Sequence, residues 1–372
     1  MLADSVELLH ECIEISLKNY MNKVDYFQIR KKFRQILCVF SMTVTVFISG
    51  ITRECAFAKT NDSDDIVLAV CAAGPTHDWT ADVMRYAQEE LERVEKDNGW
   101  KTIFCYSDDI YEQSQMVVDL VKEGVDCLVL FPMDGASLKT AAISVKQAHI
   151  PLVIFDREIP EFAPTATVKG DNWGIGEKTA EYFNNYFYSG TTVLELMGDT
   201  STVPFQRTDG YDSTIGPAFK KIQIGYTEWK RDTSRKLFQD WVQEQEQSTL
   251  DEVGAIFTHD DEIALGVLDV LDKYKEEGIR ESLFPNLQVI SGSSSSQKMY
   301  RRIRTEDRYT LFSMTYNSDM IKEAVRTGEQ ILKGENYDEM KIYPTIYVTK
   351  DNVEDYIIEG YSEYNPETES NE

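Results

Sequence analysis

The stretch Ile150-Pro-Leu-Val-Ile-Phe-Asp-Arg157 places an apolar run directly before a carboxylate and a guanidinium. A short apolar run of this kind is typical of a buried strand, which leaves Asp156 and Arg157 where the strand ends. Open α/β sheets bind small molecules at the carboxyl ends of their strands. The stretch therefore indicates an α/β fold with a ligand site at one edge of a sheet.

Three further segments have the same form. Residues 71–79 read Cys-Ala-Ala-Gly-Pro-Thr-His-Asp-Trp, residues 206–211 read Gln-Arg-Thr-Asp-Gly-Tyr, and residues 257–262 read Phe-Thr-His-Asp-Asp-Glu. Each places polar or aromatic side chains at the end of a predicted strand or at the beginning of the next helix. This order suits a site that encloses a small molecule better than it suits an enzyme.

Strand and helix patterns alternate along the chain. The apolar runs predict strands at 66–71, 102–106, 127–131, 152–155, 192–196, 255–258 and 289–292. The helical patterns cover 79–96, 111–122, 136–148, 176–188, 234–246 and 262–276. Glycines at 99, 124 and 278 mark predicted helix ends. Such alternation predicts parallel sheets built from right-handed crossovers.

Length and charge limit the possible classes of protein. A chain of 372 residues with 42% apolar residues fits two packed domains of about 150 residues each. The formal net charge of -26 repels nucleic acid phosphates, so the sequence predicts no nucleic acid partner. The surplus of acids is equally compatible with a surface that simply stays soluble.

Residues 1–58 are predicted to be a leader and signal peptide. Basic residues between Lys23 and Arg34 precede the apolar run 36–50, and Ala56-Phe-Ala58 offers small residues to a signal peptidase. The expectations are that Met21 is the true start, that cleavage follows Ala58 and that Cys55 is not lipidated. An uncleaved anchor stays open, because fifteen apolar residues are not far short of the ~20 that span a bilayer.

Neither a disulfide framework nor a metal site is expected. Three cysteines remain after the predicted cleavage, Cys71, Cys105 and Cys127, and all lie in apolar runs that predict buried strands. An odd number of cysteines cannot close completely into disulfides. The four histidines are scattered, and no cysteine pair has the spacing of zinc ligands. The sequence therefore predicts no cofactor and no metal.

The order of motifs resembles the extracytoplasmic sugar-binding proteins of ABC importers, which have the type 1 periplasmic-binding fold. Within that family it is similar to the ribose and galactofuranose branch. The resemblance covers residues 66–360 and is carried by segments 150–157, 170–172, 193–198 with 207–211, and 255–266. It implies two doubly wound, Rossmann-like α/β lobes with parallel sheets. A hinge of three segments, near residues 170, 316 and 343, would join the lobes around the ligand.

By this resemblance the N-terminal lobe comprises residues 64–170 plus 317–344. The C-terminal lobe comprises 171–316 plus 345–362, and residues 363–372 form a polar tail. The implied protein is an extracytoplasmic monomer without enzymatic activity. It would capture a monosaccharide, a pentose or hexose and possibly a furanose, and deliver it to the membrane permease of an ABC importer. The alternative is a sugar sensor that presents its closed form to a membrane histidine kinase or chemoreceptor.

The resemblance also implies a set of ligand-binding residues. Carboxylates and arginine forks can take adjacent hydroxyl groups of a sugar, and aromatic faces can cover its C–H side. The residues at the matching positions are Asp78, Trp79, Asp156, Arg157, Trp173, Arg207, Trp229, Asp260, Ser294 and Tyr316. Other roles stay open for these residues. Asp156 and Arg157 could form a surface ion pair, and Arg207, which precedes a predicted turn at Gly210-Tyr211, could cap a helix or be a solvated charge. The tryptophans could serve packing alone.

Three positions depart from the family pattern. Asp260 stands where relatives usually have Asn, Ser294 is the nearest match to an Asp, and Tyr316 replaces a Gln or a similar polar group. An acceptor-only carboxylate at 260 favours hydroxyl or amine donors on the ligand. The departures leave the identity of the sugar open.

Other chemistries fit the sequence less well. The segment 170–179 lacks the glycine-lysine spacing of a phosphate loop, because Glu177 separates Gly176 from Lys178. Asp156 and Asp260 could form a glycosidase pair, but a carboxylate held ionised by Arg157 would be a poor general acid. A sugar-responsive repressor would begin with a helix-turn-helix, whereas this chain begins with an export pattern and is acidic.

Overall fold

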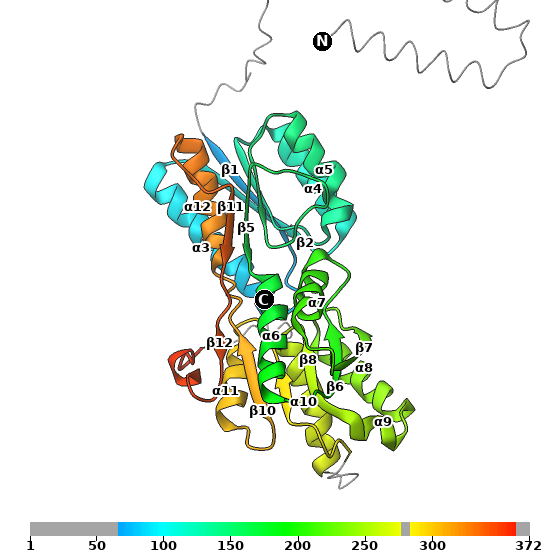
Figure 1. Ribbon diagram of the computed structural model, residues 1–372. Helices are drawn as coiled ribbons and strands as arrows, with labels where there is room; N and C mark the ends of the chain where they lie inside the picture. Colours follow the sequence, from blue (N-terminus) through cyan, green and yellow to red (C-terminus); the bar gives the residue numbers. More distant parts are fainter. Residues whose placement is uncertain (1–65, 277–282, 362–372) are drawn as a thin grey trace, which may run out of the picture. The chain divides into compact units, whose positions relative to one another are not determined.

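The computed structural model describes residues 66–276 and 283–361 (Figure 1). The first lobe contains β1 (Val67–Ala73), α3 (Asp78–Asn98), β2 (Lys101–Ser107), α4 (Ile110–Glu123), β3 (Cys127–Leu130), α5 (Gly135–Gln147), β4 (Leu152–Phe155), β5 (Ala166–Gly170), α12 (Met320–Lys333) and β11 (Met340–Tyr343). The second contains α6 (Asn172–Tyr186), β6 (Thr192–Met197), α7 (Thr202–Thr214), β7 (Lys220–Tyr226), α8 (Arg231–Glu244), α9 (Gln247–Glu252), β8 (Val253–Thr258), α10 (Asp261–Glu276), β9 (Val289–Ser291), α11 (Gln297–Thr305), β10 (Thr310–Met314), β12 (Tyr347–Val348) and a 3-10 turn (Val353–Asp355).

Each lobe is built on one six-stranded sheet. The strand order is β11-β5-β4-β3-β1-β2 in the first sheet and β12-β10-β9-β8-β6-β7 in the second. The strand pairs are parallel except for β10 and β12, which are antiparallel. The predicted fold class, two doubly wound α/β lobes with parallel sheets, is confirmed.

The central strand β1 shows why its sequence reads as a continuous apolar run. Its side chains alternate between the two faces of the sheet, and helices cover both faces. Leu68 and Val70 pack in one core cluster with α3 and α12 residues, whereas Ala69 and Cys71 pack in another with residues of α4 and α5. Both faces are therefore buried, and no polar alternation is needed.

Local capping explains where several helices begin and end. The Asp109 side chain accepts a hydrogen bond from Glu112 N at 2.9 Å at the start of α4, and Asp134 caps α5 in the same way. Gly99 and Gly124 end α3 and α4 in the left-handed conformation, as predicted. The predicted helix end at Gly278 lies outside the described residues.

The prediction of a turn at Gly210-Tyr211 is wrong, because both residues lie inside α7. The glycine serves helix packing instead. A Cβ atom at Gly210 would lie 2.2 Å from Trp173 O, and one at Gly176 would lie 1.9 Å from Arg207 O. Glycines on facing sides therefore let α6 and α7 approach closely, and this contact fixes the backbone of Arg207.

The chain passes between the two sheets at three places. These are the step from β5 to α6 after Gly170, the segment between β10 and α12 that contains Tyr316, and the step from β11 to β12 after Tyr343. The crossings lie where the hinge segments were expected. The limits of the lobes at 64–170 plus 317–344 and 171–316 plus 345–362 stay predictions.

The leader at 1–58 and the polar tail at 363–372 lie outside the described residues. Among the helices of residues 66–361 that the structure describes, none is long and apolar enough to cross a membrane. Cys71 and Cys127 are buried, Cys105 is half-buried, and all three are free thiols.

Candidate functional site

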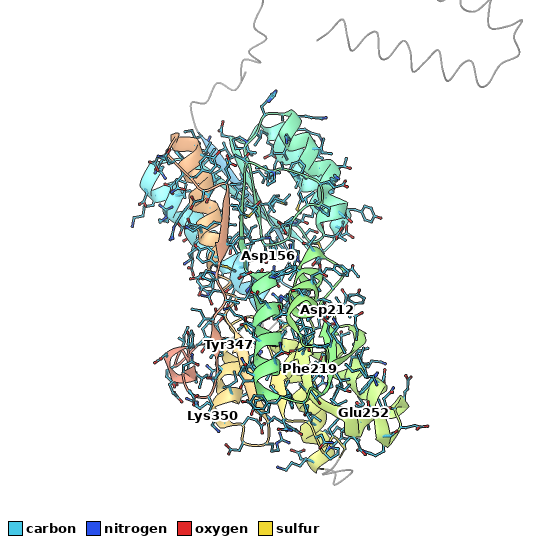
Figure 2. All side chains as sticks on the ribbon, viewed as in Figure 1. Asp156, Asp212, Phe219, Glu252, Tyr347 and Lys350 are labelled. Atoms are coloured by element: carbon cyan, nitrogen blue, oxygen red, sulfur yellow. The ribbon has the colours of Figure 1, made fainter. Side chains whose placement is uncertain are left out.

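Eight of the ten predicted site residues line one small cavity between the two sheets. This inner cavity has a volume of about 30 Å³. Its predicted lining residues are Trp79, Asp156, Arg157, Arg207, Trp229, Asp260, Ser294 and Tyr316. They come from both lobes, and Figure 2 shows Asp156 at the level where the lobes meet. Their role in binding stays a prediction, but the structure brings them together.

Several of these residues are placed by unusual backbone conformations at the ends of strands. Asp156 follows β4 with φ of 63°, Trp229 follows β7 with φ of 61°, and Ser294 follows β9 with φ of 141°. Positive φ at a residue with a side chain costs of order 1–3 kcal/mol and persists where the surrounding structure enforces it. Three such residues at one cavity favour a functional role for these loops.

Asp156 and Arg157 are buried, 4% and 8% exposed, so they do not form the surface ion pair that the sequence left open. Asp156 Oδ1 accepts a hydrogen bond from the Tyr316 hydroxyl. Arg157 Nη1 donates to Met133 O at 2.5 Å, and Nη2 lies 3.5 Å from Asp199 Oδ2 in the other lobe. The buried Nε of Arg157 makes no hydrogen bond with the described residues and is available to a ligand oxygen.

Burial and the neighbouring charges act in opposite directions on the pKa of Asp156. Burial raises the pKa of this carboxyl above its ordinary value, while Arg157, Tyr316 and Arg207 lower it by a smaller amount. The nearest approach of Arg157 Nε to Asp156 Oδ2 is 4.0 Å, so the guanidinium does not make a close bidentate pair. Arg157 therefore offsets only part of the effect of burial on the pKa of Asp156.

Arg207 is buried within the second lobe and is held by neutral acceptors. Its Nε donates to Asn172 Oδ1 at 3.0 Å, and its Nη1 donates to Ser293 Oγ at 2.9 Å and to His259 O. The hydrogen bonds of the Arg207 guanidinium thus use Nε and Nη1. Arg207 is neither a helix cap nor a solvated charge, and Nη2 is a donor that a ligand could use.

Two aromatic side chains and Arg207 form the walls around Tyr316. The Arg207 guanidinium lies 5.4 Å from the Trp229 ring and 4.9 Å from the Tyr316 ring. Trp79 Nε1 donates to Tyr316 O at 2.8 Å, and its ring is stacked on Phe155 with centroids 6.2 Å apart. Both tryptophans therefore pack in the core and also line the cavity.

Tyr316 itself fills much of the space between the lobes. Its hydroxyl donates to Asp156 and accepts from Asn172 Nδ2 at 3.0 Å. Its ring packs so closely against Gly170 that a Cβ there would lie 2.1 Å from Cε2. The side chain does more than approach a ligand from the hinge, because it occupies the position beside Asp156 and leaves only a small inner cavity.

Asp78 and Trp173 lie away from the inner cavity. Asp78 Oδ2 pairs with Lys298 Nζ across the lobes at 2.7 Å and lines a second, larger cavity. Trp173 is 48% exposed and lines neither cavity. The residue before it, Asn172, was not predicted as a site residue, but its side chain contacts both Arg207 and Tyr316.

His77 and Val203 line the inner cavity without having been predicted. A signal existed for His77, because it stands two residues before Trp79 in the same strand-end segment. Burial lowers the pKa of His77 to about 3, with a further contribution from Arg157, so its ring is uncharged at neutral pH. Val203 has no signal in the sequence beyond its place at the start of α7.

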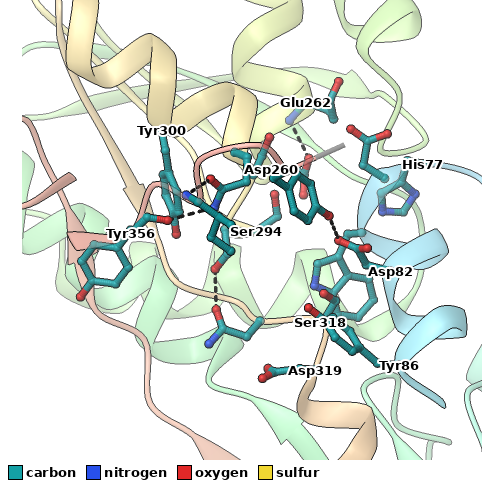
Figure 3. A pocket seen from close by; sticks show the side chains of 18 residues that line it. His77, Asp82, Tyr86, Asp260, Glu262, Ser294, Tyr300, Ser318, Asp319 and Tyr356 are labelled. Atoms are coloured by element: carbon teal, nitrogen blue, oxygen red, sulfur yellow. Dashed lines mark hydrogen bonds between the residues drawn. The ribbon is translucent and has the colours of Figure 1, made fainter. Parts of the chain in front are cut away.

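The second, outer cavity has a volume of about 240 Å³ and adjoins the inner one (Figure 3). The two cavities share His77, Trp79, Asp260 and Ser294. Asp260 Oδ1 accepts from Glu262 N at 2.7 Å at the start of α10. Burial raises the pKa of Asp260 well above its ordinary value, and the neighbouring Asp261 raises it further.

The carboxyl of Asp261, which is fully buried behind the cavity, should make the folding stability of the protein depend on pH. Its Oδ1 accepts from Ser313 Oγ at 2.7 Å and its Oδ2 from Ser296 N at 2.9 Å, while burial raises its pKa from 3.8 to about 7. Between pH 4 and 7 this carboxyl is therefore protonated in the native state and ionised in the unfolded state. The contribution of Asp261 to the free energy of unfolding falls as pH rises through this range.

Urea unfolding at pH 4.5 and 7.5 tests this assignment with the Asp261→Asn variant. The free energy of unfolding of the wild type is expected to fall relative to that of the variant as pH rises between these values. Equal differences at both pH values would contradict a raised pKa for Asp261.

Comparison with protein families places most of the described chain in one of them. Residues 68–336 match the family model described as a periplasmic binding protein domain. The ribose import binding protein of Bacillus subtilis is 26% identical over 184 residues, which are 49% of this chain and 59% of that protein. A xylitol-binding protein of Mycolicibacterium smegmatis is 21% identical over 273 residues, 72% of this chain and 74% of that protein.

Solved structures show the same fold. An ABC transporter solute binding protein from Mycobacterium smegmatis with bound glycerol has a TM-score of 0.69 at 20% identity, covering 81% of this chain and 100% of that one. The fructose binding periplasmic domain of a hybrid two component system has a TM-score of 0.65 at 20% identity, covering 78% of this chain and 92% of that domain. With the match of residues 68–336, these findings show that the chain belongs to the periplasmic binding protein family.

Proposed function

We propose that this protein captures a monosaccharide or a related polyol between its two lobes. The observation that carries the proposal is the convergence of side chains from both lobes on one cavity, with Asp156 and Arg157 on one side and Arg207 and Asp260 on the other. Relatives that bind ribose and xylitol support a hydroxyl-rich ligand. The proposal includes no chemical step on the ligand.

The polar groups match the needs of a hydroxyl-rich ligand. Each sugar hydroxyl can donate and accept, so it pairs with a carboxylate on one side and a guanidinium on the other. Arg157 Nε and Trp229 Nε1 have no hydrogen-bond partner among the described residues, Arg207 Nη2 is a further donor, and Asp156 and Asp260 supply acceptors. Trp79, which lines both cavities, offers an apolar face to the ring carbons. Binding at 1 μM corresponds to about -8 kcal/mol, which a few charge-assisted hydrogen bonds and one or two stacking contacts can supply.

Closure of the lobes gives the proposed mechanism. Hydrogen bonds or ion pairs join the lobes between Arg157 and Asp199 at 3.5 Å, between Lys298 and Asp78 at 2.7 Å, and between Gln206 and Glu158. A ligand that contacts both sides only when the lobes are together shifts the equilibrium toward this closed arrangement. The closed arrangement is the form that a partner would recognise.

The proposed partner is the membrane permease of an ABC importer, and the proposed location is extracytoplasmic, with the protein acting as a monomer. The fold similarity to a periplasmic domain of a hybrid two component system favours one alternative, in which the closed form signals to a membrane kinase. Reconstituting the protein with a candidate permease in vesicles distinguishes the two roles. Ligand uptake that depends on this protein supports delivery, whereas binding without uptake favours sensing.

A thermal-shift panel of pentoses, hexoses, furanoses and polyols tests the binding proposal directly. A ligand at 100 times its Kd stabilises the native state by about 2.7 kcal/mol, and at least one member is expected to raise the midpoint by roughly 5 °C. Asp156→Ala is expected to abolish this shift, while Asp240→Asn, which removes an exposed acid of α8, retains it. A panel without any shift, or an equal shift in Asp156→Ala, contradicts the proposed site.

A further inference from the structure

The outer cavity has a composition that the capture of a neutral sugar does not explain. Among the described residues that line it are five acids, Asp78, Asp82, Asp260, Glu262 and Asp319, and none is a lysine or an arginine. His77, the one lining histidine, is uncharged at neutral pH, because burial lowers its pKa to about 3. The walls of the cavity therefore carry only negative formal charge.

Basic residues around the rim neutralise only part of this charge. Lys298 pairs with Asp78 at 2.7 Å, and Arg85 pairs with Asp82 at 3.0 Å. Lys322 lies over the Tyr86 ring at 4.4 Å but is paired with Glu89 at 2.7 Å. Asp78 and Asp82 thus have basic partners at the rim, whereas Asp260 and Asp319 form no ion pair with another described residue.

A second feature, independent of the acids, points to a ligand. Tyr300 is 2% exposed and lines the outer cavity, yet its hydroxyl forms no hydrogen bond with any described residue. A buried hydroxyl without a partner is unfavourable by about 1–3 kcal/mol. Figure 3 shows Tyr300 and Tyr356 on one side of the cavity and Tyr86 and Asp82 on the other. A polar ligand group between them would satisfy the Tyr300 hydroxyl, and the aromatic rings offer faces to a cation.

The size of the two cavities decides how a ligand is divided between them. The inner cavity of about 30 Å³ has room for roughly two water molecules, because Tyr316 fills the space beside Asp156. Only one or two polar groups of a ligand therefore fit there in the closed arrangement. The larger part must lie in the outer cavity of about 240 Å³, and Asp260 and Ser294 contact both.

We propose that the ligand is an amino-substituted saccharide or polyol whose hydroxyl groups reach the inner cavity and whose protonated amine lies in the outer cavity against Asp260 and Asp319. The inference rests on the proposed function and specifies its ligand class. Burial raises the pKa of Asp260, and a neighbouring ammonium group would favour its ionised form. A bare metal ion fits less well, because no cluster of three or more potential ligands is formed by the described His, Cys, Asp and Glu residues.

Calorimetry on the full chain with matched ligand pairs tests this inference. The pairs are D-glucosamine with D-glucose, D-galactosamine with D-galactose, and 1-amino-1-deoxysorbitol with sorbitol, with the two N-acetylhexosamines as uncharged controls. Because hydrogen bonds to charged groups are roughly twice as strong as neutral ones, the amine is expected to bind at least about tenfold more tightly in one pair or more. The N-acetyl derivative is expected to lose this advantage.

Two variants locate the amine. Asp260→Asn and Asp319→Asn are each expected to lower the ratio of amine to neutral affinity by at least about threefold, since each removes one charge from the cavity. Asp319 is exposed and stands at the beginning of α12, so its replacement does not disturb a core. Asp240→Asn, an exposed acid of α8 with the same change of charge, is the matched control and should leave the ratio unchanged.

The possible failures are distinguishable. If the neutral member binds at least as tightly in every pair, the amine inference is overturned while saccharide capture stands. If neither member of any pair binds but the thermal-shift panel yields a ligand, only the amine inference is overturned. If the panel also yields no ligand, the proposed function is overturned together with the inference. An affinity ratio unaffected by both Asp260→Asn and Asp319→Asn would overturn the assignment of the amine to the outer cavity.

Discussion

Arg207→Lys is expected to weaken binding of the best saccharide from the panel by about a hundredfold. Each factor of ten in Kd corresponds to about 1.4 kcal/mol of binding free energy. Lysine keeps the charge but loses the planar fork. In this structure Nε holds Asn172 and Nη1 holds the loops of Ser293 and His259, which leaves Nη2 for the ligand. A single ammonium cannot hold these loops and donate to the ligand in the same geometry.

The measurement is calorimetric titration of the wild type and the variant, with circular dichroism as a check that both are folded. The matched control is Arg235→Lys, which alters an exposed arginine of α8 that is paired with Asp232. Its affinity should equal that of the wild type. An unchanged affinity in Arg207→Lys would show that the guanidinium has no part in binding.

Gly176→Ala is expected to destabilise the protein by about 3 kcal/mol, at the upper end of the range for added volume in a packed interior. The added Cβ would lie 1.9 Å from Arg207 O, a backbone atom that cannot move aside as the end of a flexible side chain can. Helices α6 and α7 would have to separate, and Arg207 would move with α7.

Urea unfolding measures the stability change, and saccharide titration measures the displacement of Arg207. Gly216→Ala is the control, because its Cβ would meet the Asn184 side chain at 3.1 Å and the Phe219 ring at an ordinary contact distance of 3.8 Å. Its effect should stay below about 1 kcal/mol. A Gly176→Ala protein as stable as Gly216→Ala would contradict the close approach of α6 and α7.

Much of the fold could be predicted from local patterns. The apolar run of β4 was recognisable because a strand buried on both faces has no polar alternation. The helix ends after α3 and α4 were recognisable because glycine readily adopts the left-handed conformation found there. Helix α7 (Thr202–Thr214) was not predicted. Its Gly210 reads as a turn residue in the sequence, although in the structure it serves the contact with Trp173 O.

The site was predictable where it depends on strand ends and less so where it depends on distant contacts. Asp156, Arg207 and Asp260 follow from their places in the four opening segments. The ion pair of Asp78 with Lys298 joins residues 220 positions apart, so no local sequence pattern could predict it. The filling of the cleft by Tyr316 likewise depends on Gly170 and Asn172, which come from another crossing between the lobes.

The central claim is that side chains from both lobes close on one saccharide. A crystal structure of the protein with the panel's best ligand tests it most directly. We expect ligand oxygens within hydrogen-bond distance of Asp156 or Arg157 and, at the same time, of Arg207 or Asp260. A ligand bound outside the two cavities, or one held by a single lobe, would contradict the claim.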